Sequence, residues 1–316
     1  MTKGKTKLLS SRKFEIIKEI FTKFSKRRKE KLVVSISYLY KIAEVSRSGY
    51  YSYFSKNIVE AREIRENKDS EKFKQIETAY KYKNRKKDIR QIKMTLEKQF
   101  NIIMNLKTIR RLMKKYGLKC PIRKSNPYRR IMKATQEHRV VENKLNREFK
   151  QNIPRKVLLT DIIYLYFDNG KKAYLSTIKD SCTNEIIVYN LSKTLHIEIV
   201  LETLKQLSIN DEIAIKEDTF IHSDQGVHYT SPIFQDAVKK MNLGQSMSRR
   251  ANCWDNAPQE SFSGHFKDEA YIKECSTYEE LENEINKYME YYNKERGQLN
   301  LKKITPIEYR NHLLES

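Results

Sequence analysis

The chain has 316 residues and a formal net charge of +23, from 63 Lys and Arg against 40 Asp and Glu. No apolar run approaches the roughly 18 residues that span a membrane, and the N-terminus has no apolar signal segment. The four cysteines lie far apart and pair with no histidine at zinc-ligand spacing, which argues against a structural zinc or a disulfide framework and fits a cytoplasmic protein.

The positive charge is concentrated in the first half of the chain. Residues 1–160 carry 45 Lys and Arg against 15 Asp and Glu, whereas residues 161–316 carry 18 against 25. This asymmetry predicts a basic nucleic-acid-binding half joined to a different module. A lysine-rich codon bias would explain the total charge, but it explains the asymmetry less well.

The first 56 residues predict helices. Residues 11–33 form a basic helical pattern with apolar positions on one face. Residues 36–54 predict a short helix, a turn at Val45–Arg47 and a second helix capped by Ser46 or Ser48. This second pattern resembles a helix-turn-helix, in which Arg47 is a candidate DNA contact. A small hairpin of helices packed through tyrosines fits it equally well.

Residues 58–120 also predict helices. A charged helix at 58–82 precedes a helical pair at Asp88–Phe100 and Leu106–Tyr116, with Asn105 as an N-cap and Gly117 at the C-terminal end. The last helix has apolar residues at 109, 112 and 113 and is otherwise cationic. Its candidate DNA contacts are Arg110, Arg111 and Lys114. A solvated basic face is the alternative, and residues 119–135 predict a basic linker.

From Arg155 the pattern changes to strands. Val157–Phe167 is apolar and β-branched, and Asp168-Asn169-Gly170 is a hairpin turn signal. Further strands are predicted at Ala173–Ile178, Glu185–Leu191 and Thr219–His222, and helices at about 195–208, 232–241, 256–272 and 278–294. Three hairpin-connected strands followed by alternating helix and strand predict a ribonuclease H-like α/β core with a mixed five-stranded sheet, preceded by an all-α helix-turn-helix-type basic region.

Three carboxylates in this half predict a metal site. Asp161 lies in the first strand between the apolar Leu159 and Ile163. Asp224 follows the strand Thr219–His222, at the edge where open α/β sheets place their sites. Glu260 opens a helix that Asp255 or Asn256 would cap. Such ligands suit two Mg²⁺ or Mn²⁺ ions that catalyse phosphoryl transfer.

Each of these acidic residues has a simpler interpretation when taken alone. Glu260 would favour a helix N-terminus in any protein. His222 and His228 flank Asp224, but packing is their more economical role. Lys267 shares a helix face with Glu260 and is a candidate phosphate contact, as are Arg249 and Arg250.

Several motifs resemble one family in particular. They are Thr160-Asp161, His222-Ser223-Asp224-Gln225-Gly226, Ser246-Met247-Ser248-Arg249, Asp255-Asn256-Ala257 with Glu260-Ser261-Phe262, and Tyr292-Asn293-Lys294-Glu295-Arg296. Over about residues 40–310 the chain resembles the catalytic subunit of a bacterial insertion-sequence transposase with two overlapping reading frames, in the DDE, retroviral-integrase-like superfamily. The resemblance implies that Asp161, Asp224 and Glu260 are the acidic triad. Ala251, Gln298 and Leu159 depart from the usual Gly, His and aromatic residue.

The resemblance implies a DNA transposase that cleaves element ends and joins their 3′-OH groups to target DNA. A hydrolytic nuclease or resolvase of the same fold, and a non-catalytic DNA-binding regulator, are the alternatives. The implied partners are double-stranded DNA, further copies of the chain and an upstream-frame helix-turn-helix protein, fused to the chain or separate. The expected location is the bacterial cytoplasm, at the nucleoid.

We expect five segments along the chain. They are a basic helical segment (1–56), a helical DNA-binding domain (57–120), a basic linker (121–150), the catalytic core (151–275) and a C-terminal helical extension (276–316).

Overall fold

The computed structural model describes residues 9–26, 36–120, 141–145, 151–209, 218–248 and 256–315. The chain divides into two compact units between Gln75 and Ile76, within helix α4 (Lys56–Lys81). No helix in these ranges is long and apolar enough to cross a membrane.

The first unit is built on a core of aromatic side chains. Its other helices are α1 (Ser10–Lys26), α2 (Ile36–Ala43) and α3 (Arg47–Phe54). Phe14, Ile17, Tyr40 and Tyr50 are buried together, and the rings of Phe14 and Tyr50 meet edge to face with centroids 6.0 Å apart. The tyrosines therefore contribute packing as well as polarity.

The turn between α2 and α3 forms as the sequence predicts. Ser46 is the N-cap of α3, and its hydroxyl accepts a hydrogen bond from the Gly49 amide at 3.0 Å. A Cβ on Gly49, in the first turn of α3, would lie 2.8 Å from this hydroxyl and 3.2 Å from the Phe14 ring, so a larger residue here would require both side chains to shift. The predicted helix at 11–33 is described as far as Lys26, and residues 27–35 lie outside the described ranges.

The second unit begins with a helical pair. It consists of α5 (Ile89–Phe100) and α6 (Leu106–Lys115), after a 3₁₀ turn at Tyr82–Asn84. Asp88 caps α5 and Asn105 caps α6, and each side chain accepts a hydrogen bond from a backbone amide in the first turn. Gly117, which follows α6, adopts a φ of +75°. These caps confirm the expected boundaries. Most of the predicted linker lies outside the described ranges.

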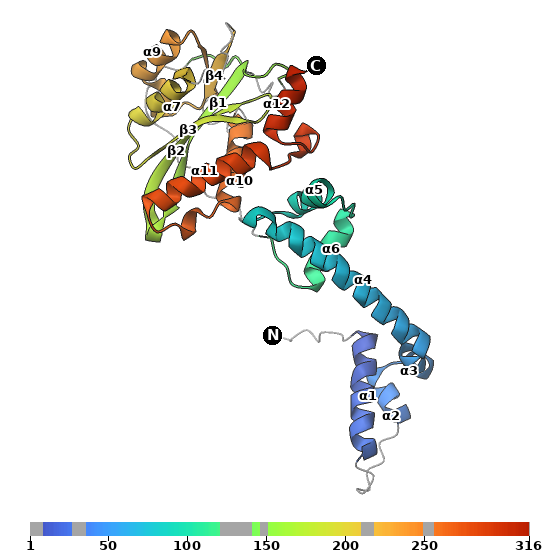
Figure 1. Cartoon of the computed structure of the whole chain (residues 1–316). Helices are drawn as coiled ribbons and strands as arrows, with labels where there is room; N and C mark the ends of the chain where they lie inside the picture. The colour runs from blue at the N-terminus through green and yellow to red at the C-terminus, as the bar shows by residue number, and fades with distance from the viewer. Residues whose placement is uncertain are drawn as a thin grey trace. The chain divides into compact units, whose positions relative to one another are not determined.

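A mixed five-stranded sheet forms the centre of the second unit (Figure 1). Its strands are β1 (Val157–Phe167), β2 (Lys171–Asp180), β3 (Ile186–Ser192), β4 (Phe220–Ser223) and β5 (Gly244–Met247). The order is β3-β2-β1-β4-β5. The first three strands pair antiparallel, whereas β1–β4 and β4–β5 are parallel. This arrangement confirms the predicted fold class.

Helices cover both faces of the sheet. They are α7 (Glu198–Ile209), α8 (Val227–Thr230), α9 (Pro232–Lys240), α10 (Ala257–Glu269), α11 (Tyr278–Lys294) and α12 (Pro306–Leu314). On one face, Ile163 and Leu165 pack against Phe262 and Phe266 of α10 and against α11. On the other, Leu158 and Ile178 pack against α7 and α9. Alternation along β1 thus divides its side chains between two cores.

Two expectations for α10 were wrong in detail. The helix ends at Glu269, because Ala270 adopts an extended backbone, and a separate 3₁₀ turn follows at Ile272–Glu274. Asn256 occupies the N-cap position, but its side chain makes no capping hydrogen bond. Asp255, the other expected cap, lies outside the described ranges.

Candidate active site at the end of the central strands

The central parallel pair of strands brings Asp161 and Asp224 together. The ladder between β1 and β4 pairs Val157 with Phe220 and Leu159 with His222. Counted two residues beyond the last pair of this ladder, Asp161 within β1 corresponds to Asp224 directly after β4. Both carboxylates are half-buried.

A buried tyrosine hydroxyl lies close to both carboxylates. Burial, together with the negative charges of Asp161 and Asp224, raises the pKa of Tyr229 well above its usual value. The Tyr229 hydroxyl lies 3.4 Å from the Thr160 hydroxyl.

Backbone amides orient one oxygen of each carboxylate. Asp161 Oδ1 accepts from the Ile162 amide at 2.9 Å, and Asp224 Oδ1 accepts from the Gly226 amide at 2.8 Å. A Cβ on Gly226 would lie 2.8 Å from Asp224 Oδ1, so a larger residue here would displace that carboxylate oxygen. These local hydrogen bonds orient the Asp161 side chain within β1 and the Asp224 side chain directly after β4.

Glu260 is exposed on the first turn of α10. Its neighbour Gln259 is fully buried and donates from Nε2 to Thr177 Oγ1 at 2.5 Å. Thr177 lies directly opposite Asp161 in the β1–β2 ladder. The first turn of α10 is therefore attached to the sheet at the level of Asp161.

A second contact holds the same turn. Lys179 of β2 is 3% exposed, and its amine donates to the Pro258 carbonyl oxygen at 2.9 Å. Burial lowers the pKa of Lys179 to about 7. Sequence reasoning missed Lys179, Thr177 and Gln259. The one available signal was the charged Lys179-Asp180 pair at the end of an apolar strand.

The carboxylate pair has the chemistry that a hard divalent cation requires. Carboxylate oxygens such as those of Asp161 and Asp224 are donors that Mg²⁺ or Mn²⁺ prefer. Within the described ranges, no three His, Cys, Asp or Glu side chains are gathered closely enough to hold one ion. The neighbouring pair Asp161 and Asp224 thus fits such a metal, and Glu260 stands apart on the adjoining helix.

The two histidines beside Asp224 serve packing, as expected. His222 is fully buried, and its Nδ1 is hydrogen-bonded to Ser246 Oγ at 2.9 Å, which links β4 to β5. His228 lies on α8 and donates from Nε2 to the Leu195 carbonyl oxygen at 3.0 Å. Both side chains connect elements around the site.

The predicted DNA contacts occupy three different places. Arg47 is exposed on α3 of the first unit. Exposed residues Arg110, Arg111 and Lys114 lie together on α6, opposite its buried residues Ile109, Leu112 and Met113. Lys267 is half-buried on α10. Arg249 and Arg250 lie outside the described ranges.

The Tyr292–Arg296 motif supports the fold around the site. Arg296 and Glu269 are both buried and form an ion pair, with Arg296 Nη2 and Nε each within 3.1 Å of the carboxylate. Asn293 bonds both backbone groups of Ile186 at the start of β3. Gln298 stands where the family usually has His, and its side-chain oxygen accepts a hydrogen bond from Asn184 Nδ2 at 3.1 Å. This motif fixes α11 to α10 and to the sheet.

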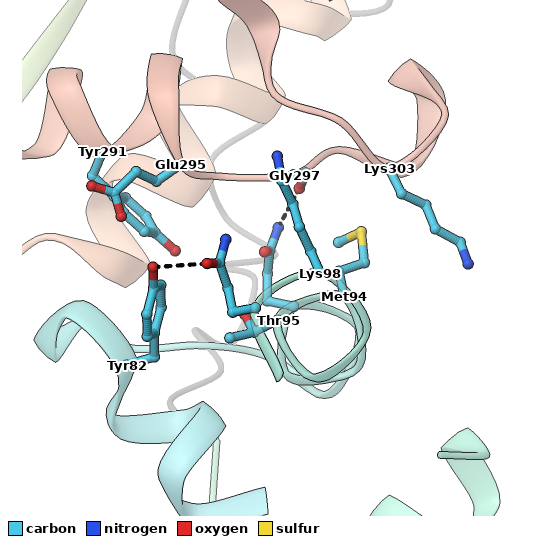
Figure 2. Close-up of a pocket in the computed structure, with 10 residues that line it drawn as sticks. Tyr82, Met94, Thr95, Lys98, Tyr291, Glu295, Gly297 and Lys303 are labelled. Atoms are coloured by element: carbon cyan, nitrogen blue, oxygen red, sulfur yellow. Dashed lines mark hydrogen bonds between the residues drawn. The ribbon is translucent and has the colours of Figure 1, made fainter. Parts of the chain in front are cut away.

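A small pocket in the second unit is lined by none of Asp161, Asp224 and Glu260. Figure 2 shows it between α5 and the segment that links α11 to α12, lined by residues that include Tyr82, Lys98, Glu295 and Lys303. Tyr82 donates to Gln99 at 3.1 Å, and Gln91 donates to the Gly297 carbonyl oxygen at 3.0 Å. Ion pairs Lys98–Glu308 and Lys303–Glu97 flank it. The pocket is thus part of the joint between the helical pair and the C-terminal helices.

Comparison with protein families assigns the helical pair and the sheet region to different families. Residues 66–126 match a family described as an HTH-like domain, and residues 151–253 and 260–314 match two families described as integrase core domains. The HTH-like match covers α5 and α6 and does not include residues 36–54. The integrase matches contain Asp161, Asp224 and Glu260.

Several bacterial proteins are similar over most of this chain. The putative transposase InsK for insertion sequence element IS150 of Escherichia coli K12 is 34% identical over 276 residues, which cover 86% of this chain and 92% of that protein. An uncharacterized transposase-like protein of Haemophilus influenzae is 36% identical over 224 residues, covering 70% of this chain and 100% of that protein.

Solved structures of integrases also align with the chain. The HTLV-2 integrase catalytic core domain in complex with magnesium aligns with a TM-score of 0.39 and 18% identity, covering 50% of this chain and 97% of that one. The catalytic core domain of BIV integrase aligns with a TM-score of 0.37 and 14% identity, covering 51% of this chain and 99% of that one.

Proposed function

Because this chain belongs to the bacterial insertion-sequence transposases of the retroviral-integrase-like superfamily, we propose that it cleaves the ends of its element and joins them to target DNA. The observation that supports the proposal is the parallel register of β1 and β4: counted two residues beyond its last pair, Asp161 within β1 corresponds to Asp224 directly after β4. Paired carboxylates at such an edge suit phosphoryl transfer between DNA strands.

Asp161, Asp224 and Glu260 would hold two Mg²⁺ or Mn²⁺ ions. Bound there, the ions would supply activation of the attacking oxygen and stabilisation of the leaving oxygen. The Gly226 and Ile162 amides orient the two aspartates, and Tyr229 lies beside both of them. Glu260, at the start of the neighbouring helix, would complete the set as the third carboxylate.

The basic residues would bind the DNA. The cationic face of α6, with Arg110, Arg111 and Lys114, would contact backbone phosphates. Lys267 on α10 and Arg249 and Arg250 near its start would contact phosphates near the reacting bond, and Arg47 would contribute from the first unit. The division between a positively charged half and the catalytic half supports this assignment.

The active assembly would contain several copies of the chain and a helix-turn-helix protein from an upstream frame, fused to the chain or separate. The supporting feature is the short helix-turn-helix-like segment at 36–54. A transposase has to recognise a specific sequence at the element end, and we expect this segment alone to be too short for that. Acting on element ends and target DNA, the protein would work in the bacterial cytoplasm, at the nucleoid.

A strand-transfer assay tests the proposed reaction. The full chain is incubated in Mg²⁺ with a labelled duplex that carries an element end and with a target plasmid. A joined product longer than the substrate is the expected result. Products that are only shorter than the substrate would identify a hydrolytic nuclease, and binding without any cleavage would identify a DNA-binding regulator.

A further inference from the structure

Lys179 is a buried amine with no local reason to be buried. It lies near the end of β2, opposite the fully buried Leu159 of β1. Burying an amine in an apolar sheet is unfavourable unless the amine finds a partner. Its partner is the Pro258 carbonyl oxygen, 2.9 Å away and 79 residues further along the chain.

A second contact from the same strand holds the same turn of α10. Gln259 is fully buried and donates to Thr177 at 2.5 Å. Thr177 and Lys179 point to the same face of β2, because they are two residues apart. Two successive residues, Pro258 and Gln259, are therefore held from the sheet directly before Glu260.

The first turn of α10 depends on these contacts because its own cap is missing. Asn256 occupies the N-cap position without a side-chain capping bond, and its buried Oδ1 has no hydrogen-bond partner. By contrast, α11 and α12 both begin with complete capping boxes. The sheet thus fixes the start of α10 in place of a local cap.

We propose that Lys179 is a positioning residue that, with the Thr177–Gln259 hydrogen bond, sets Glu260 at the height of Asp161 so that the third carboxylate can join the metal site. This inference rests on the proposed function, since it assumes that Glu260 is a metal ligand. Residues that orient a ligand without touching the metal commonly change metal affinity by about 10- to 100-fold when they are replaced.

The experiment measures binding of Mn²⁺ alone to the full chain, from the paramagnetic resonance signal of unbound Mn²⁺. Lys179→Met is expected to raise the apparent Kd for Mn²⁺ about tenfold or more while the protein stays folded. Thr177→Val, which removes the acceptor for Gln259, should shift the Kd in the same direction. The Mg²⁺ concentration for half-maximal end cleavage should rise in parallel for both variants.

Lys87→Met is the matched control. Lys87 is also fully buried and donates to the backbone carbonyls of Tyr80, Tyr82 and Arg85, at the end of α4. Its replacement should lower thermal stability and leave the Kd for Mn²⁺ unchanged. If Lys179 only stabilised the fold, Lys179→Met would likewise lower thermal stability and leave the Kd for Mn²⁺ unchanged.

The outcomes separate the two ideas. Folded Lys179→Met and Thr177→Val proteins that bind Mn²⁺ like the parent would overturn the positioning role. If Lys179→Met does not fold, Thr177→Val alone decides the question. Asp224→Asn that binds Mn²⁺ as well as the parent would instead reject the proposed metal site itself.

Discussion

Thr177 lies directly opposite Asp161 in the ladder between β1 and β2, and its hydroxyl accepts a hydrogen bond from the residue that precedes Glu260. A single strand position therefore connects the carboxylate of the sheet with that of the covering helix. The candidate site draws on three segments that are distant in the sequence.

Asp224→Asn should abolish end cleavage and strand transfer and leave DNA binding nearly unchanged. The amide removes a charged oxygen ligand, whereas binding depends on the basic half of the chain. Both activities are measured in Mg²⁺ on an end-containing duplex, with a gel shift for binding. Asp236→Asn, the same change at an exposed position of α9, is the control and should retain activity. Catalysis by the Asp224 variant would exclude this residue as a ligand.

Replacing Arg110, Arg111 and Lys114 together with Ala should weaken DNA binding and reduce its salt dependence. Each lost phosphate contact lowers the slope of log K against log salt by about 0.9. Binding of the full chain is measured at several salt concentrations. A triple Ala variant at Lys205, Lys239 and Lys240, on α7 and α9, serves as the charge-matched control. Equal slopes for the two triple variants would contradict a DNA-binding role for α6.

Arg296→Met should destabilise the second unit by about 3–5 kcal/mol, because Glu269 is left buried without its partner. Chemical denaturation of the full chain measures the loss. The control is Lys294→Met, which removes an exposed ion pair with Glu290 in the last turn of α11 and should cost only about 0.3–0.5 kcal/mol. Similar losses for both variants would show that the buried pair adds little.

The contribution of Lys87 to stability should depend on pH. Burial lowers its pKa to about 8 in the folded protein, from an ordinary value of 10.5. The unfolded chain therefore binds more protons between these pH values, and stability from this group rises as the pH increases from about 8 to 10.5. Lys87→Met should lose that rise. The difference in unfolding free energy between parent and variant, measured at pH 7.5, 9 and 10, should grow with pH in favour of the parent.

The isolated chain should distinguish an element end from scrambled DNA poorly, since its predicted recognition segment at 36–54 is short. A gel shift at moderate salt compares the two duplexes. A ratio of affinities above the order of 10³, typical of dedicated sequence readers, would show that the chain needs no upstream-frame partner.

Many features of this protein follow from local sequence patterns. Apolar and β-branched residues predicted β1, capping residues predicted the starts of α3 and α6, and Asp168-Asn169-Gly170 predicted the hairpin. These features depend on neighbouring residues, so the sequence contains their physical cause. The motifs around Asp161, Asp224 and Glu260 likewise indicated the family, which the comparisons confirm.

The tertiary structure alone decided how these pieces support one another. Lys179 finds its acceptor 79 residues away, Gln259 reaches Thr177 across 82 residues, and Arg296 meets Glu269 on a different helix. Asn256 is of a residue type common at N-caps, yet its side chain makes no capping hydrogen bond. Contacts from the sheet hold the first turn of α10 instead. Such partnerships depend on strand register and helix packing, which are fixed by the whole core. No local pattern in the sequence carries that information.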